Sequence, residues 1–152
     1  MIMRFVTSVC VAVLLAAAGA LAGDDGPGFI YLQKDEVDLE GGSSDFNVRS
    51  RVIVGDPDKE GIYVMRIEFG PNVTSPPHYH DQDRYVTVIS GVWGFGRGAS
   101  GDCDETVPMT EGAFVMHPKG AVHYDGSCNG EPVVVQIIGM GPVKTTRLEA
   151  GD

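Results

Sequence analysis

The stretch PPHYHDQDRYVTVISG, residues 76–91, decides the fold class and also raises the question of function. Its second half, RYVTVIS, alternates like a β-strand and is rich in β-branched residues. Its first half places His78 and His80 one residue apart. Alternate side chains of a strand share a face, so the two imidazoles can reach one point in space. Such a pair is a frequent ligand set for divalent metals, although it also occurs by chance on protein surfaces.

The rest of the chain repeats this strand pattern. Short β-type runs are separated by segments rich in Gly, Pro and Asp, which have the turn chemistry expected between strands. The runs cover residues 49–54, 61–69, 84–90, 92–95, 112–117, 121–124 and 132–139. No segment after residue 22 has a sustained helical period of apolar residues. The sequence therefore predicts one all-β barrel or sandwich over residues 46–148, preceded by a flexible segment at 23–45.

The first 22 residues, MIMRFVTSVCVAVLLAAAGALA, have the features of a secretory signal peptide. An early cation, Arg4, precedes an apolar run that ends in Ala-Leu-Ala, which predicts cleavage after Ala22. The alternative is a membrane anchor, because the apolar run of 18 residues (5–22) is at the short limit for spanning a bilayer. We favour cleavage, and we expect a secreted or periplasmic protein that has no membrane association once the signal is removed.

The charge of the chain excludes some classes of partner. The net charge of −10 becomes about −11 after residue 22, because the leader contains one cation and no acidic residue. Nucleic acids and anionic membrane surfaces bind basic faces, so neither is expected as a partner.

Two cysteines are left once the leader is removed. Cys103 and Cys128 form an even pair in an oxidising compartment, and both lie in turn-like segments. We therefore predict a disulfide between them in preference to two free thiols.

A second histidine motif, GAFVMHPKGAVHY at residues 112–124, strengthens the interpretation of His78 and His80 as metal ligands. It resembles the second motif of the cupin superfamily, and residues 72–91 resemble the first. The matching positions are His78, His80 and Gly91 in the first motif, and Gly112, Pro118, Gly120 and His123 in the second. Three positions depart from the family pattern: Asn72 stands for a glycine, Arg84 for an acidic residue and Ser127 for an asparagine. The resemblance, which covers roughly residues 60–140, implies a small single-domain (type-2) cupin, a double-stranded β-helix or jelly-roll barrel.

The resemblance also implies a cofactor. Cupins hold a mononuclear metal with three histidines and one carboxylate, which implies His78, His80 and His123 as ligands of one divalent transition metal (Fe, Mn, Ni, Cu or Zn). Asn72 stands where the family has glycine, a mild departure because asparagine tolerates the left-handed turn conformation.

Arg84 is the serious departure, because it stands where the family has the carboxylate. A guanidinium cannot ligate a metal and stays protonated. A bulge could let Asp83 or Gln82 supply the fourth ligand while Arg84 turns aside. The site could instead use three histidines only, or the metal could be lost and Arg84 could bind an anionic ligand directly. In either metal-bound case Arg84 could pair with Asp81 or Asp83, or it could bind a substrate carboxylate at the rim of the barrel.

The other notable side chains are assigned structural roles. His117 precedes Pro118 at a position where apolar residues are common in this fold, which favours a packed or hydrogen-bonded role over ligation. Trp93 and Phe95 alternate on one face and are most simply core residues. An outward aromatic face that joins two subunits is the alternative, so a homodimer is a further hypothesis.

These features lead to two functional hypotheses from different classes. The first is an exported enzyme with a mononuclear metal that acts on a small organic substrate, with an oxygenase as first choice and an isomerase or lyase as second. The second is a non-catalytic cupin that binds a ligand or uses the metal only to stabilise the fold.

Overall fold

A computed structural model of the chain describes residues 28–37, 39 and 47–148. The expected signal peptide lies outside the described residues, so its cleavage stays a prediction. The described part of the segment expected to be flexible contains one short 3-10 helix, η1, at Lys34–Glu36. Among the described residues, no helix has the length and apolar character needed to cross a membrane.

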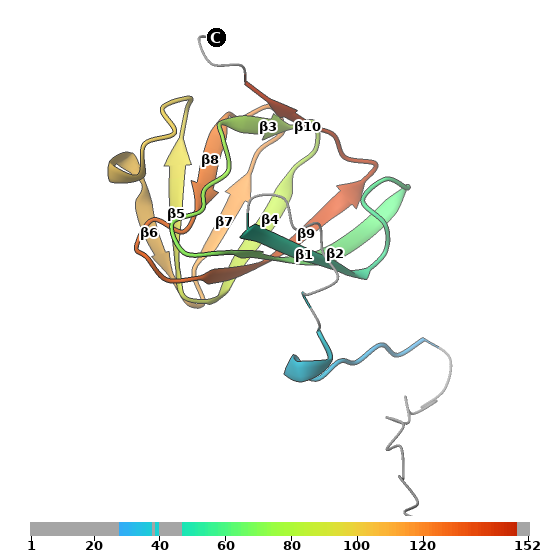
Figure 1. Cartoon of the computed structure of the whole chain (residues 1–152). Helices are drawn as coiled ribbons and strands as arrows, with labels where there is room; N and C mark the ends of the chain where they lie inside the picture. Colours follow the sequence, from blue (N-terminus) through green and yellow to red (C-terminus); the bar gives the residue numbers. More distant parts are fainter. Residues whose placement is uncertain (1–27, 38, 40–46, 149–152) are drawn as a thin grey trace, which may run out of the picture. The chain divides into compact units, whose positions relative to one another are not determined.

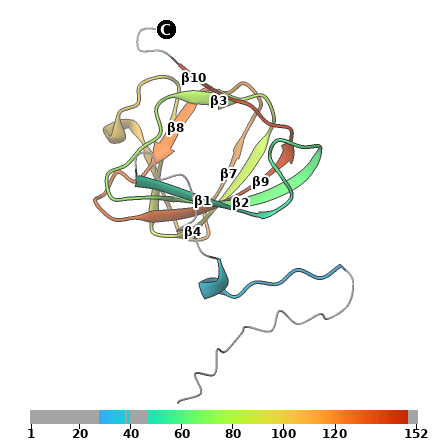
Figure 2. The ribbon, with the colours of Figure 1, turned by 45° about the vertical axis from the view of Figure 1, so that its right-hand side comes forward.

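Residues 48–147 form two five-stranded antiparallel sheets (Figure 1). The first sheet has the order β1-β2-β9-β4-β7 and the second β10-β3-β8-β5-β6. The strands are β1 (Val48–Val54), β2 (Gly61–Phe69), β3 (His78–His80), β4 (Arg84–Ser90), β5 (Val92–Arg97), β6 (Val107–Thr110), β7 (Phe114–His117), β8 (His123–Gly126), β9 (Val133–Gly141) and β10 (Thr145–Arg147). The two sheets surround a common interior (Figure 2). This arrangement confirms the predicted all-β jelly-roll barrel.

The runs read from the sequence omit three of these strands, among them β3, for which only the His-x-His spacing is a signal. The other two are β6 and β10. Both lie at the edges of the second sheet, where each pairs with one neighbour only. β6 contains Pro108, which is tolerated in a sheet mainly at an edge, and β10 has three residues. Such strands form because a neighbouring strand offers them a partner, so their own residues carry little signal.

The core lies between the two sheets and is made of alternating side chains. The cluster of buried apolar residues is Tyr63, Phe69, Val86, Val88, Trp93, Val133, Val135 and Ile137. Trp93 is 1% exposed, so it belongs to the core, and an outward aromatic face built on it is excluded. The homodimer stays a prediction, because the structure describes one chain.

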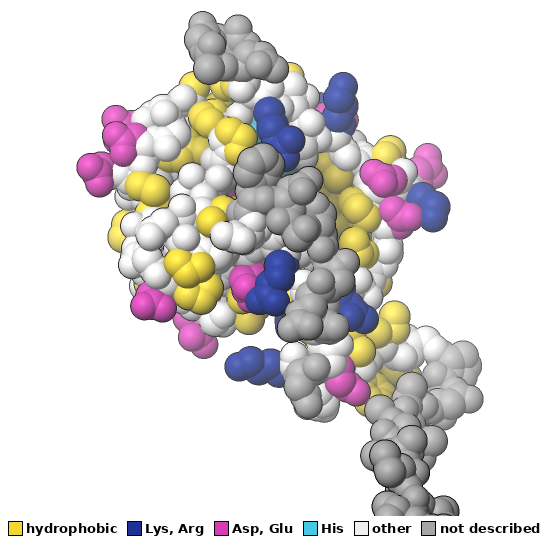
Figure 3. Space-filling model, viewed as in Figure 1, with side chains coloured by type: hydrophobic (Ala, Val, Ile, Leu, Met, Phe, Trp, Pro, Cys, Tyr) yellow, Lys and Arg dark blue, Asp and Glu magenta, His cyan; other side chains and the backbone are white. Residues whose placement is uncertain are grey.

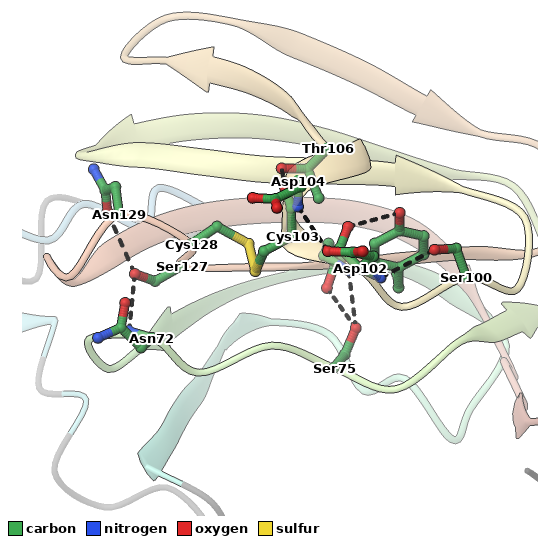
Figure 4. The surroundings of a disulfide bond; sticks show 12 residues. Asn72, Ser75, Ser100, Asp102, Cys103, Asp104, Thr106, Ser127, Cys128 and Asn129 are labelled. Atoms are coloured by element: carbon green, nitrogen blue, oxygen red, sulfur yellow. Dashed lines mark hydrogen bonds between the residues drawn. A yellow bond between two sulfur atoms is a disulfide. The ribbon is translucent and has the colours of Figure 1, made fainter.

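The predicted disulfide joins Cys103 to Cys128, with Cα atoms 5.6 Å apart (Figure 4). It links the 3-10 helix η3 (Cys103–Glu105) to the segment that follows β8. Next to it, the buried Ser127 accepts a hydrogen bond from the amide of Asn72 at 3.3 Å. Asn72 has φ of +57°, the left-handed conformation expected of a residue that replaces glycine. The segment that follows β8 is thus tied to η3 by the disulfide and to the turn before β3 by Ser127.

Charged side chains of both signs are interspersed on the face of the molecule shown in Figure 3. The expected absence of nucleic-acid and membrane partners stays a prediction.

Candidate metal centre

Three histidines from two neighbouring strands meet inside the barrel. His78 and His80 are the ends of β3, and His123 begins β8, with His78 and His123 directly opposite each other in the sheet. Their ring centroids lie 4.3 to 5.2 Å apart, and one possible ligand nitrogen from each lies within 4.8 Å of the others. All three side chains are buried. The structure therefore brings together the three residues that the sequence predicts as ligands.

Hydrogen bonds set the tautomer of each ring. Nδ1 of His78 donates to the carbonyl of Pro76, and Nδ1 of His123 donates to the carbonyl of Ala121, both at 2.9 Å. A carbonyl only accepts, so the proton is on Nδ1 and Nε2 of each ring keeps its lone pair. Anchoring the far nitrogen to a carbonyl is the usual support of a metal-binding imidazole.

His80 has the same tautomer for a different reason. Its Nδ1 lies 3.0 Å from Oγ1 of Thr145, the cross-strand neighbour on β10, and its Nε2 accepts from Nη1 of Arg84 at 2.9 Å. Burial, together with the adjacent Arg84 guanidinium, lowers the pKa of His80 to about 2. The pKa of His123 is also lowered, chiefly by burial. Both imidazoles are therefore neutral near pH 7, as metal ligation requires.

Unsatisfied polar atoms gather at this site. Among the described residues, four buried side-chain nitrogens have no hydrogen-bond partner. Three of them are imidazole nitrogens, Nε2 of His123 and both nitrogens of His117, and the fourth is the indole nitrogen of Trp93. Buried polar atoms are normally paired, because leaving one unpaired costs about 1–3 kcal/mol. A metal ion fits this donor set, since it would take the lone pair of His123.

Arg84 points into the barrel. Besides His80, its guanidinium contacts Oη of Tyr63, to which Nε donates at 2.9 Å, and Sδ of Met65 at 3.5 Å. β4 is in regular register with both neighbours at this position, and its irregularity falls later, between Val88 and Ser90. No bulge turns Arg84 aside.

The residues expected to replace the carboxylate lie in the turn between β3 and β4. Asp83 is exposed, and its carboxylate accepts from the backbone amide of Lys119 at 2.7 Å. It is not among the groups of possible ligands that the described residues form. Gln82 is half-buried in the same turn. The geometry thus supports a site without a carboxylate from this turn.

A glycine makes the position of Arg84 possible. On β9, Gly139 lies opposite Tyr63 of β2 on one side and opposite Arg84 of β4 on the other. A Cβ at Gly139 would lie 2.5 Å from Oη of Tyr63. The missing side chain lets the Tyr63 ring cross over β9 and reach the guanidinium.

A cavity of about 500 Å³ opens onto this site. Its polar lining includes His78, His80, Arg84, His117 and Asp125. Its apolar lining includes Val48, Ile67, Phe69, Val86, Trp93, Val135 and Ile137. Apolar walls with a few convergent polar groups are typical of sites for small organic molecules.

The family comparison agrees with this architecture. Residues 31–144 match the family described as a domain of unknown function, DUF4437. The chain belongs to this family. No curated protein matches the chain.

Solved structures show that the DUF4437 chain has the cupin fold. The polyketide cyclase RemF from Streptomyces resistomycificus has a TM-score of 0.61 at 19% identity over 81% of this chain and 89% of its own. A cupin-like protein from Thermotoga maritima has a TM-score of 0.57 at 24% identity, over 70% of this chain and 83% of its own. A sugar phosphate isomerase of the cupin superfamily from Silicibacter pomeroyi has a TM-score of 0.56 at 17% identity, over 80% of this chain and 74% of its own. At these identities the similarity shows the fold alone.

Sequence reasoning missed two residues of the site, Tyr63 and Asp125. Asp125 lies two residues after His123 on β8, so strand parity could have placed it on the same inner face. It is 7% exposed and accepts from Oγ of Ser75 at 2.8 Å. Tyr63 had no such signal, because its role depends on Gly139, a residue 76 positions later in the chain.

Proposed function

We propose that this protein is an exported cupin enzyme that holds one divalent transition metal on His78, His80 and His123 and acts on a small organic anion. The observation that carries the proposal is the set of three buried imidazoles whose Nε2 atoms bear lone pairs, one of them without any partner. The bound metal would supply Lewis acidity and open coordination positions for a substrate.

The charge balance favours an anionic substrate. The three imidazoles are neutral ligands, so a divalent ion would bring two uncompensated positive charges next to the Arg84 guanidinium. An anion in the cavity would relieve this repulsion, and a guanidinium binds carboxylates and phosphates with paired hydrogen bonds. We assign to Arg84 the binding and orientation of that anion, after it exchanges its contact with Nε2 of His80 for one with the substrate.

The reaction class follows from the predicted ligand set. Three protein ligands leave positions for both an organic substrate and oxygen, so an oxygenase that uses iron, manganese, nickel or copper is our first choice. An isomerase or lyase, for which zinc would also serve, is the second. Proteins of this fold described as a polyketide cyclase, a DMSP lyase and a sugar phosphate isomerase support the use of the barrel for reactions of small molecules.

A non-catalytic ligand-binding or structural cupin is the second candidate, and one observation favours it. Arg84 occupies Nε2 of His80, one of the three nitrogens that the metal needs. A barrel that binds an anion directly on Arg84 would keep this contact and would need no metal.

Metal content of the purified protein tests the proposal. We expect about one equivalent of transition metal per wild-type chain, and less than a tenth of that in His78→Ala and His123→Ala, because each variant removes one of three ligands. Elemental analysis by mass spectrometry gives the occupancy. Tyr79→Ala is the matched control, since Tyr79 lies between the two histidines of β3 and alternates to the other face; its occupancy should equal that of the wild type.

Activity assays then separate the two candidates. The metal-loaded protein is tested for oxygen uptake and product formation with phenols, flavonoids, thiols and small carboxylates. Turnover by the wild type that is lost in His123→Ala would support the proposal that the protein is an enzyme. Full occupancy in either histidine variant would refute the ligand assignment, and bound metal without turnover would favour the binding protein.

A further inference from the structure

The fourth histidine of the chain, His117, lies in the barrel beside the predicted metal ligands. It ends β7 and sits directly opposite Arg84 of β4 in the first sheet. Its side chain is 4% exposed and lines the same cavity. The ring stacks against Phe95 and Trp93, with centroids 5.2 and 5.8 Å away. Aromatic packing therefore accounts for the faces of the ring but not for its nitrogens.

Both nitrogens of His117 are buried without a hydrogen-bond partner. A neutral imidazole has one N–H donor and one acceptor, and both are left unpaired here. His78, His80 and His123 each have Nδ1 paired to a carbonyl or a hydroxyl. The packed or hydrogen-bonded role expected from the sequence thus explains why the ring is packed. It does not explain why residue 117 is a histidine.

His117 is close to the other imidazoles. Its ring centroid is 3.9 Å from that of His123 and 6.4 Å from that of His80, to which it is parallel. Its ligand nitrogen lies within 4.8 Å of a nitrogen of His123 and an oxygen of Asp125. His123 is thereby common to both groups of possible ligands, and it has one free nitrogen for one ion.

We propose that His117 is a fourth protein ligand of the ion held by His78, His80 and His123, an inference that rests on the proposed function. It supplies from β7 the donor that the cupin pattern places at position 84, where this chain has an arginine. Positions 84 and 117 are cross-strand neighbours. A ligand at position 117 in place of one at position 84 therefore stays on the same side of the barrel.

Asp125 is the competing donor in this part of the cavity, and its contacts argue against it. Its Oδ1 accepts from the hydroxyl of Ser75 at 2.8 Å, and the hydroxyl of Ser75 lies 3.4 Å from Nδ1 of His78. The carboxylate therefore has partners in a network behind the ligands. His117 has none, which makes it the group that gains most from binding a cation.

The variant His117→Phe tests the proposal, because phenylalanine keeps a planar ring against Trp93 and Phe95 and removes both nitrogens. We expect the affinity for Co²⁺ or Zn²⁺, measured by competition with a chelating dye, to fall at least tenfold. The metal-free variant should unfold at the same or a higher urea concentration than the metal-free wild type, since two unpaired buried nitrogens are gone. A structural histidine would give the opposite pattern.

Nitrogen counting provides the second measurement. Electron paramagnetic resonance or X-ray absorption of the Cu²⁺-loaded protein should show four imidazole ligands in the wild type and three in His117→Phe. Trp93→Phe is the control, since it changes the packing of His117 without removing a donor, and its affinity should stay within threefold of the wild type. Unchanged affinity and nitrogen count in His117→Phe would overturn this proposal and leave the three-histidine function intact. A wild type that binds no metal would overturn both.

Discussion

At the scale of single residues, Arg84 is the most serious departure of this chain from the cupin motifs that its histidines match. Strand parity places residue 84 on the same face as His78 and His80, and the structure shows its guanidinium inside the barrel. The side chain is positioned by Tyr63 and Met65 and donates to a nitrogen that a metal would need. Arg84 would therefore compete with a bound metal for Nε2 of His80.

The substitution Arg84→Glu would remove the competitor of the metal at His80 and add a possible metal ligand. It removes a positive charge, frees Nε2 of His80 and adds a carboxylate at the position of the family ligand. We expect metal affinity to rise at least tenfold and the affinity for small carboxylates to fall, both measured by titration calorimetry. Arg66→Glu makes the same charge change on the outer face of the first sheet, where Nε of Arg66 donates to Gln136. If both variants changed metal affinity equally, the effect would be one of net charge rather than of position.

At the scale of elements, β9 links β4, which carries Arg84, to β2, which carries Tyr63 and Met65. It runs between β2 and β4, and Gly139 is the point at which Tyr63 crosses it to reach Arg84. The chain on either side of Gly139 alternates normally, with Ile137 buried and Ile138 41% exposed. The glycine is therefore a requirement of side-chain packing between neighbouring strands rather than of a turn.

Gly139→Ala should destabilise the protein by about 1–3 kcal/mol, because the new methyl group must displace the buried Tyr63 ring. Urea unfolding measures the change. Met140→Ala, one residue later on the same strand, is the control; its side chain is 51% exposed, so its effect should be within about 0.5 kcal/mol. Equal effects of the two substitutions would contradict the packing role of Gly139.

At the scale of the whole molecule, the barrel keeps several imidazoles away from water. Burial lowers the pKa of His80 and His117 to about 2, against 6.5 for a free side chain. The unfolded chain takes up protons below pH 6.5 that the folded chain does not. The stability associated with each buried histidine is therefore present above pH 6.5 and is lost progressively as the pH falls toward 2.

Acidification of the metal-free protein tests this linkage. Between pH 7 and pH 5, His117 alone should account for a loss of about 2 kcal/mol in the free energy of unfolding. His117→Phe should lose correspondingly less over the same interval, which urea titrations at several pH values would show. An identical pH dependence in both proteins would mean that His117 is accessible to protons in the folded state.

The sequence by itself determined the all-β class, the facing directions of His78 and His80, and the cysteines that pair as Cys103–Cys128. Strand parity is local, so residue spacing is enough to predict which side chains share a face. The tertiary structure decided which faces meet. It set His117 opposite Arg84, brought Asp125 in behind His78 and laid Tyr63 across Gly139. These contacts join residues from different strands, and the order of strands in a sheet is fixed by the packing of the whole barrel rather than by the residues of any one strand.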